Sequence, residues 1–256
     1  MVNFRTIRMS DKRAAVQFDN VGYTVGGTVV ISGLDIEIYQ GETLVLLGES
    51  GCGKTTTLKL INRLIEPTSG EIFVESKRTI DWDAVELRRH IGYVLQEGGL
   101  FPHYTVEQNV SLVTGLLGWD DKRRRDRARE MLQLVGLDPA RFADRFPHEL
   151  SGGQRQRVGV ARALAADPEM VLLDEPFGAL DAITRTNLQK EFARLVRELG
   201  KTAIFVTHDL HEAMLLGTRI ALMDKGKIAL LATPHEFKQS ELPLVRAYME
   251  TAFVTA

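Results

Sequence analysis

The sequence contains a single cysteine and no long apolar segment, and each shortage excludes a kind of protein. With Cys52 alone, the chain can form neither an internal disulfide nor a multi-cysteine metal cluster, which suits a reducing compartment. No apolar run approaches the roughly 18 residues that a membrane-spanning helix needs. If the protein works at a membrane, we therefore expect another chain to provide the span.

A strong net charge of either sign is also missing. The formal net charge is −2, so no overall field favours nucleic acid or an anionic membrane surface. The most basic stretch, residues 120–130, has acidic residues between its arginines, and Met131, Leu132 and Val135 continue a helical pattern. We interpret this stretch as a solvated helix face with i,i+4 ion pairs, and we expect no nucleic-acid partner.

The remaining composition is that of an ordinary globular protein, with 44% hydrophobic and 26% charged residues. Residues 1–15 are mildly basic but lack the apolar stretch of a signal peptide, so we expect a short flexible arm there. No internal repeat is visible. We expect residues 16–256 to form a single domain.

Four short apolar runs bounded by turn residues predict buried strands, at residues 43–48, 91–96, 170–175 and 202–209. Apolar stripes at helical spacing separate most of them. The stripes are Leu58, Ile61 and Ile65; Val158, Ala161, Leu164 and Ala165; and Leu188, Phe192, Leu195 and Leu199. Strands that alternate with helices predict an α/β fold with a mostly parallel sheet covered on both faces.

The two ends of the chain follow a different pattern. Residues 16–27 and 33–42 alternate apolar and polar side chains, which predicts an N-terminal antiparallel β subdomain. Residues 219–234 predict a hairpin that turns at Lys225 and Gly226.

A long central stretch, between Gln96 and Leu150, is helical in pattern, polar and poor in strands. We therefore predict a helical subdomain, at about residues 97–168, that is inserted in the α/β core and is not an independent domain.

The first glycine-rich segment, "GESGCGKT" at residues 48–55, fits the pattern G-x-x-x-x-G-K-[ST] between an apolar strand and an amphipathic helix. Glycines let backbone N–H groups approach phosphate oxygens, and the helix start adds about half a positive charge. Lys54 has the reach for β- and γ-phosphates, and the Thr55 hydroxyl is a hard oxygen ligand suited to Mg²⁺. The pattern predicts a P-loop NTPase (RecA-like) core that holds a nucleotide through Gly48, Glu49, Ser50, Gly51, Cys52, Gly53, Lys54, Thr55 and Thr56.

A pair of carboxylates follows the third apolar run, at the strand edge where open α/β sheets bind ligands. An ionised carboxylate is rarely buried without a partner, and Mg²⁺ beside Thr55 would be such a partner for Asp174. Glu175 points elsewhere and would polarise a water for attack on the γ-phosphate. Gln96 and His208 end two further strands at the same edge, so we predict that both join this site.

A second glycine-rich helix start, "LSGGQRQRVGVARAL" at residues 150–164, carries no group for acid–base or metal chemistry. The Ser151 hydroxyl and the N–H groups of Gly152 and Gly153 would hold an anion through position and helix dipole alone.

The order of these motifs resembles that of the ATPase subunits of ABC transporters, and the resemblance covers roughly residues 16–232. Its most specific piece is "LSGGQ", placed between the first glycine loop and "VLLDE". The resemblance implies that residues 48–55 are Walker A and that residues 170–174 are Walker B, followed by Glu175 as the general base. ATP and Mg²⁺ are then the expected cofactors, with Thr55, Gln96 and Asp174 as metal-binding groups and Lys54, Gln96, Glu175 and His208 as catalytic ones.

The resemblance also implies a head-to-tail homodimer. Each ATP would lie between Walker A of one subunit and Ser151, Gly152, Gly153 and Gln154 of the other. Residues 178–181 resemble a D-loop, in which Asp181 faces the opposing subunit.

One feature departs from the family pattern. An aromatic residue usually precedes the "GG" of the first hairpin and stacks on adenine, but this chain has Val25 there. Tyr23 lies two residues earlier, on the same face if the strand is regular. We expect weaker adenine stacking, or stacking on Tyr23.

Further stretches resemble one branch of the family, the bacterial importers of quaternary-amine osmoprotectants such as glycine betaine, choline or carnitine. They are "LKLINRLIEPTSGEI" and "ELRRHIGYVLQEGGLFPHYTVEQNV". The implied partners are transmembrane permease subunits and, indirectly, an extracytoplasmic substrate-binding protein. The chain would then sit on the cytoplasmic face of the inner membrane, and we expect no C-terminal regulatory domain.

Three alternatives remain open from the sequence. The chain could energise import of another small solute, act as a soluble ABC ATPase away from any transporter, or bind nucleotide as a non-catalytic regulator. Leu100, Phe101 and Tyr104 favour a transporter, because they suit a docking surface in a predicted loop, although local packing would also explain them.

Overall fold

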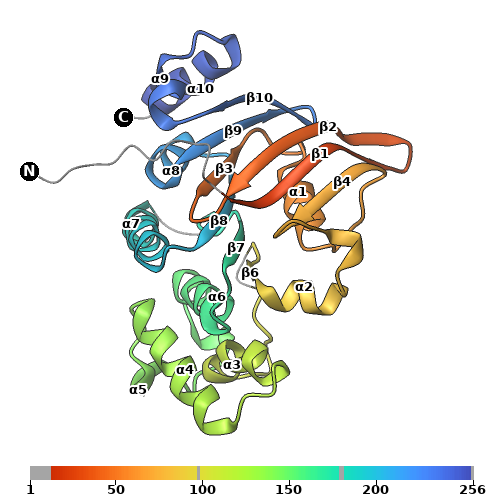
Figure 1. Cartoon of the computed structure of the whole chain (residues 1–256). Helices are drawn as coiled ribbons and strands as arrows, with labels where there is room; N and C mark the ends of the chain where they lie inside the picture. The colour runs from red at the N-terminus through yellow and green to blue at the C-terminus, as the bar shows by residue number, and fades with distance from the viewer. Residues whose placement is uncertain (1–12, 97–98, 179–181, 255–256) are drawn as a thin grey trace, which may run out of the picture.

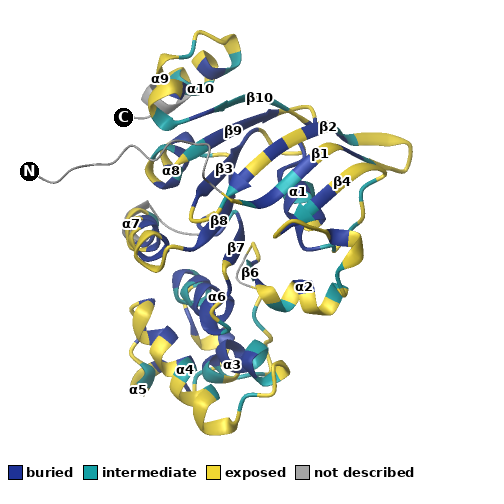
Figure 2. Ribbon diagram, viewed as in Figure 1, coloured by how far each residue is buried: buried dark blue, intermediate teal, exposed yellow. Residues whose placement is uncertain are grey.

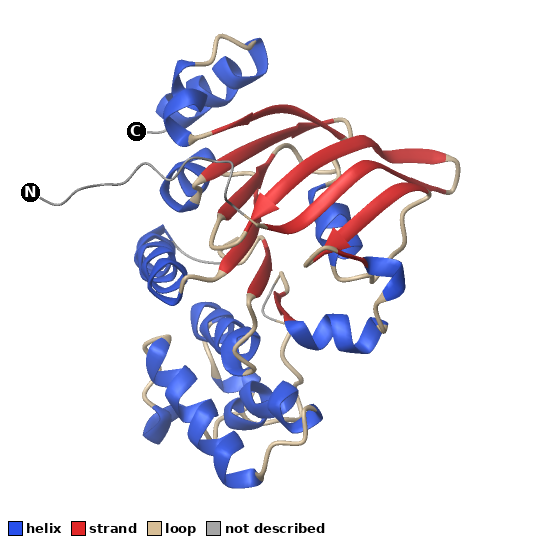
Figure 3. Ribbon diagram, viewed as in Figure 1, coloured by secondary structure: helices blue, strands red, loops and turns tan. Residues whose placement is uncertain are grey.

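The computed structural model describes residues 13–96, 99–178 and 182–254, and within them the strands form two sheets (Figures 1 and 3). The smaller sheet is antiparallel, in the order β2 (Thr28–Tyr39), β1 (Ala14–Val25), β4 (Ser69–Val74) and β5 (Lys77–Arg78). The predicted N-terminal antiparallel subdomain is confirmed. Because β1 begins at Ala14, the last two residues of the expected arm belong to this strand, and residues 1–12 lie outside the described part.

The larger sheet holds the four predicted buried strands. Its order is β10 (Lys227–Ala232), β9 (Arg219–Asp224), β3 (Thr43–Leu47), β8 (Thr202–Thr207), β7 (Met170–Asp174) and β6 (Ile91–Val94). All neighbours are parallel except β9 and β10, which form the predicted hairpin. Its turn residues, Lys225 and Gly226, have the positive φ values of 46° and 79° that such a turn requires.

Burial on both faces explains why these strands are continuously apolar. Along β3, Leu44 and Leu46 face one hydrophobic core, shared with the smaller sheet and with α1 (Lys54–Ile61). Val45 and Leu47 face the other, shared with α7 (Ala182–Leu199) and α8 (Leu210–Leu216). Figure 2 shows the buried strands as a dark central layer.

Two residues of the predicted helical stripes do not behave as expected. Helix α1 ends at Ile61, because Arg63 adopts a left-handed conformation with φ 52°, so Ile65 packs against the core from a loop. Leu199 is the last residue of α7 and is exposed, so it does not belong to the core stripe.

The helices between β6 and β7 form the lower part of the molecule in Figure 1. They are α3 (Val106–Leu116), α4 (Asp121–Leu134), the short α5 (Pro139–Phe142) and α6 (Gly152–Ala165). Side-chain caps start all four, at Thr105, Asp120, Asp138 and Ser151. The inserted helical subdomain is thereby confirmed as part of the fold, while its limits at 97 and 168 stay predictions.

The basic stretch forms α4, as expected, but its ion pairs have a different spacing. Arg124 pairs with Asp121 at 3.0 Å, and Arg127 pairs with Glu130 at 2.9 Å, both three residues apart instead of four. The expected solvated helix face is present, with shorter-range pairs.

The remaining described elements are helical. They are η2 (Thr79–Asp81), α2 (Ala84–His90), η3 (Pro147–Glu149), α9 (Pro234–Gln239) and α10 (Pro243–Val254). Within the described residues, none of the helices combines the length and apolar character needed to cross a membrane.

Candidate functional site

The first glycine loop joins β3 to α1, the strand–loop–helix arrangement that its sequence predicts. At two of its glycines the neighbouring atoms leave no room for a side chain. A Cβ on Gly48 would lie 2.6 Å from both the Met223 carbonyl oxygen and the Cys52 sulfur. Gly53 has φ 105°, and a Cβ there would lie 2.5 Å from the Ile31 side chain.

The loop is also fastened from outside. The Gly226 N–H, in the β9–β10 turn, donates to the Cys52 carbonyl oxygen at 3.1 Å, and the Ser32 N–H on β2 donates to the Gly226 carbonyl at 3.0 Å. The first glycine loop is therefore tied to both sheets through its main chain.

Lys54 lies folded over its own loop, with only 5% of its surface exposed. Its ammonium donates to the carbonyl oxygens of Gly48 (2.7 Å) and Glu49 (2.8 Å). Both contacts are with neutral acceptors, so phosphate oxygens would be stronger partners for the same charge.

Thr55 and Asp174 meet at the site predicted for Mg²⁺. The Thr55 hydroxyl donates to Asp174 Oδ1 at 2.8 Å, and Asp174 is buried. Burial raises the pKa of Asp174, and the hydrogen bond from Thr55 partly offsets that shift. A buried carboxylate beside a hydroxyl fits Mg²⁺, which binds proteins through one or two hard oxygens and completes its octahedron with phosphates and waters.

Glu175 contacts both of the other residues that were predicted at strand ends, Gln96 and His208. Gln96 Nε2 donates to Glu175 Oε2 at 3.3 Å, and His208 Nδ1 lies 3.5 Å from Glu175 Oε1. The three residues follow β6, β7 and β8, which are adjacent in the sheet, so their carboxyl ends share one edge. Glu175 has φ 43°, a rare conformation for a non-glycine residue and one that concentrates at functional sites.

The second glycine-rich segment starts α6 in the helical subdomain, whereas the P-loop belongs to the α/β core. Exposed Ser151 is the N-cap, and its hydroxyl accepts from the Gln154 N–H at 3.3 Å. Gln154 Oε1 in turn accepts from the Ser151 N–H at 2.9 Å, which completes a capping box. Binding of ATP by Ser151, Gly152, Gly153 and Gln154 stays a prediction, and Asp181 lies outside the described residues.

Tyr23 was expected to share a face with Val25 only if the strand is regular, and β1 is irregular there. Weaker adenine stacking, or stacking on Tyr23, stays a prediction. The register of β1 against β2 shifts on both sides of Tyr23, so Tyr23 and Val25 are not related by simple alternation. Tyr23 packs against the core, whereas Val25 is 54% exposed.

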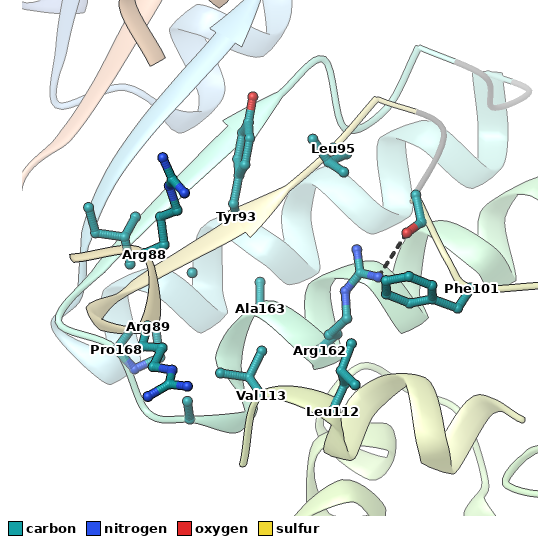
Figure 4. Close-up of a pocket in the computed structure, with 14 residues that line it drawn as sticks. Arg88, Arg89, Tyr93, Leu95, Phe101, Leu112, Val113, Arg162, Ala163 and Pro168 are labelled. Carbon is teal, nitrogen blue, oxygen red and sulfur yellow. Dashed lines mark hydrogen bonds between the residues drawn. The ribbon is translucent and has the colours of Figure 1, made fainter. Parts of the chain in front are cut away.

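A cavity of about 270 Å³ opens near the predicted docking loop (Figure 4). Phe101 lines it with Leu112, Val113 and the arginines Arg88, Arg89 and Arg162. Leu100 packs against the core, whereas the Tyr104 ring lies 5.6 Å from that of Phe101 without lining the cavity. Docking through this loop stays a prediction.

One buried carboxylate near the site, Glu212, was missed from the sequence. It accepts from the Thr207 hydroxyl at 2.5 Å, one residue before His208. The available signal was an acidic residue amid the apolar face formed by Leu210, Ala213 and Leu216.

Comparison with known proteins agrees with this geometry. The family model described as "ABC transporter" matches residues 31–178. The glycine betaine/carnitine/choline transport ATP-binding protein OpuCA of Bacillus subtilis (strain 168) is 56% identical over 82% of this chain and 55% of its own length. The glycine betaine uptake system ATP-binding protein YehX of Escherichia coli (strain K12) is 47% identical over 86% of this chain and 71% of its own.

Among solved structures, the dimeric ATP-binding cassette MJ0796, in a post-hydrolysis state bound to ADP and Pi, has a TM-score of 0.77 and 36% identity, covering 86% of this chain and 98% of that one. The chain spans little more than half the length of OpuCA. The resemblance to ATP-binding proteins of the osmoprotectant type, inferred from the sequence, is confirmed by these relatives. By its P-loop, its fold and these matches, the chain belongs to the ABC transporter family.

Proposed function

We propose that this chain hydrolyses ATP and thereby energises a membrane importer of quaternary-amine osmoprotectants such as glycine betaine, choline or carnitine. The observation that carries the proposal is the convergence of Gln96, Glu175 and His208 at the edge where Thr55 meets Asp174. The substrate class rests on the names of the relatives, which are transport proteins for these compounds.

In the proposed reaction, Lys54 exchanges its two carbonyl partners for phosphate oxygens of ATP. Thr55, Asp174 and Gln96 would hold Mg²⁺. When bound there, the ion neutralises charge on the β- and γ-phosphates. Glu175 orients and polarises the attacking water, and His208 contacts the γ-phosphate.

We infer that the active unit is a head-to-tail homodimer. Ser151, Gly152, Gly153 and Gln154 of one subunit would contact the γ-phosphate held by Lys54 of the other, and Asp181 would face the opposing subunit. This is supported by the exposed cap of α6, whose side-chain partners are its own neighbours, and by the dimeric state of the similar cassette. ATP would favour the closed dimer, and hydrolysis would reopen it.

The cavity of Figure 4 is the proposed docking place for a transmembrane permease subunit. Leu95, the neighbour of Gln96, lines it, so a displacement at this point would couple the ATP site to the permease. The chain would be peripheral to the cytoplasmic face of the inner membrane, and an extracytoplasmic binding protein would deliver the solute from the other side.

The test compares ATP hydrolysis by the wild type and by Glu175→Gln, which keeps the shape of the side chain and removes the base. We expect hydrolysis by the wild type and a loss of about 10²-fold or more in the variant. Equal, negligible hydrolysis by both proteins, with the permease present, would defeat the enzyme proposal. Uptake of labelled glycine betaine, choline and carnitine by the reconstituted importer then tests the substrate class.

A further inference from the structure

The buried carboxylate of Glu212 joins three elements next to the catalytic edge. Glu212 lies in the first turn of α8 and is only 5% exposed. One of its oxygens accepts from the Thr207 hydroxyl at the end of β8 (2.5 Å), and the other accepts from Gln189 Nε2 on α7 (2.8 Å). Burial raises the pKa of Glu212, and these two hydrogen bonds oppose that shift.

The same group of bonds fixes the main chain on both sides of His208. The Thr207 hydroxyl accepts from the Asp209 N–H at 3.0 Å. Asp209 Oδ1 accepts from the N–H groups of His211 (2.7 Å) and Glu212 (3.3 Å), and so caps α8. The side chain of His208 is itself 61% exposed, so little packing orients it. Its position depends on the backbone that Thr207 and Asp209 hold.

A small cavity of about 40 Å³ places this network against the proposed general base. Glu175, His208 and Glu212 all line it, together with Arg185 of α7. A water needs about 10–15 Å³, so the cavity has room for a small number of waters. Through Gln189 and Arg185 the network reaches α7, which begins at Ala182, directly after the predicted D-loop.

We propose that Glu212 is a positioning residue for ATP hydrolysis. Through Thr207 it sets His208 beside Glu175, and through Gln189 it ties that arrangement to α7. The role rests on the proposed ATPase function. It requires Glu212 to act through His208 and to make no contact with the nucleotide, which fits a carboxylate that is buried and has both oxygens hydrogen-bonded within the protein.

The decisive experiment is a double-mutant cycle of Glu212→Ala and His208→Ala, measured as ATP turnover with Mg-ATP binding in parallel. We expect Glu212→Ala to lower kcat by about 10–100-fold while the affinity for Mg-ATP changes by less than about threefold. The double variant should be no slower than His208→Ala alone, since both changes disable one unit. Additive losses in kcat, or no loss in Glu212→Ala, would overturn the proposal.

Two further variants separate positioning from general loss of stability. Glu212→Gln keeps the shape and, with the Gln189 amide turned around, both hydrogen bonds, so we expect hydrolysis within about threefold of the wild type. A loss as large as that of Glu212→Ala would contradict positioning through these bonds. Glu42→Ala removes a carboxylate equally buried at the opposite end of the sheet, where it accepts from the Tyr39 N–H at 2.8 Å and pairs with Arg219.

Glu42→Ala should lower Tm and leave kcat unchanged, and an equal fall in kcat would assign the effect of Glu212→Ala to destabilisation.

If Glu212→Ala does not fold, Thr207→Val replaces it in the cycle, because it removes the hydroxyl at nearly constant shape. The wild type in the same assay keeps the two proposals apart. Without wild-type hydrolysis the proposed function fails, whereas hydrolysis that is equal in wild type and Glu212→Ala rejects only the positioning role.

Discussion

The P-loop and the start of α6 are both glycine-rich helix starts, but they are completed in different ways. In the P-loop, buried Lys54 donates to two carbonyls and the Cys52 carbonyl accepts from Gly226, so the loop is braced by the rest of the core. At α6, the side chains of exposed Ser151 and half-buried Gln154 each hydrogen-bond to the main chain of the other in the capping box. The P-loop therefore has the features of a binding site that is complete within one chain. The start of α6 has those of a site that needs groups from a second chain. Substitutions should therefore separate binding by the single subunit from steps that need a second copy.

Lys54→Ala should have the largest effect and should act on the single subunit. Loss of the ammonium removes the charge aimed at the phosphates, so we expect weaker ATP binding and a fall in hydrolysis of about 10²–10³-fold. Nucleotide titration and a steady-state ATPase assay measure both. Lys122→Ala, on the exposed face of α4, is the matched loss of a lysine and should change neither. ATP binding by Lys54→Ala at wild-type strength would refute the proposed role of the P-loop.

Ser151→Arg should act only where two copies meet. We expect ATP affinity of the free subunit within about threefold of the wild type, with closure of the dimer abolished and hydrolysis reduced by about 10²-fold. Size-exclusion chromatography with Mg-ATP on a Glu175→Gln background measures closure. Thr233→Arg removes a matching capping box on α9 and controls for the loss of the cap, which costs about 1 kcal/mol. Normal ATP hydrolysis by Ser151→Arg would contradict the proposal that the start of α6 completes the ATP site of a second subunit.

Asp174→Asn should show that the buried, ionised carboxylate of Asp174 lowers the stability of the folded chain near pH 7. Because burial raises the pKa of Asp174, the stability it contributes is complete below its unfolded pKa and is lost as pH rises through its folded pKa. The asparagine cannot ionise and can still accept from Thr55. At pH 7 without nucleotide, we expect Asp174→Asn to have a higher Tm than the wild type, by about 2–4 °C for each kcal/mol gained. The difference in Tm between the two proteins should shrink as the pH falls toward 4. A Tm difference that does not depend on pH would contradict this origin.

The smallest effect is expected at the adenine side of the P-loop. Tyr23→Ala should weaken ATP binding by about tenfold if the ring stacks on adenine, which corresponds to roughly 1.4 kcal/mol. Val25→Ala, on the exposed part of the same strand, should change it by less than about twofold. Fluorescent-nucleotide titration with ATP and inorganic triphosphate as competitors isolates the adenine contribution. Unchanged affinity in Tyr23→Ala would exclude stacking on this residue.

Much of the fold was predictable because its signals are local. Each buried strand is a continuous apolar run, and the P-loop needs glycines that a short pattern identifies. The gathering of Gln96, Glu175 and His208 followed from one further rule, that adjacent parallel strands end at a common edge. No pairwise contact had to be known in advance.

The errors came from features that depend on the third dimension. The bulges of β1 cannot be read from its alternation, so the sequence did not show that a regular strand, the condition for Tyr23 and Val25 to share a face, is absent here. The end of α1 depends on the left-handed Arg63, a conformation that its residue type does not announce. Glu212 is a single acidic residue in an apolar stretch, and its partners Thr207 and Gln189 are 5 and 23 residues away along the chain.

The turn at Gly226 links parts of the protein that are remote in sequence. A Cβ there would lie 2.3 Å from the Val30 carbonyl oxygen, and the residue bonds to Cys52 and Ser32. Any side chain would thus push the β9–β10 hairpin away from β2 and from the phosphate-binding loop together. The β9–β10 hairpin therefore helps to hold the P-loop in place, so we expect a substitution at position 226 to weaken ATP binding as well as to lower Tm.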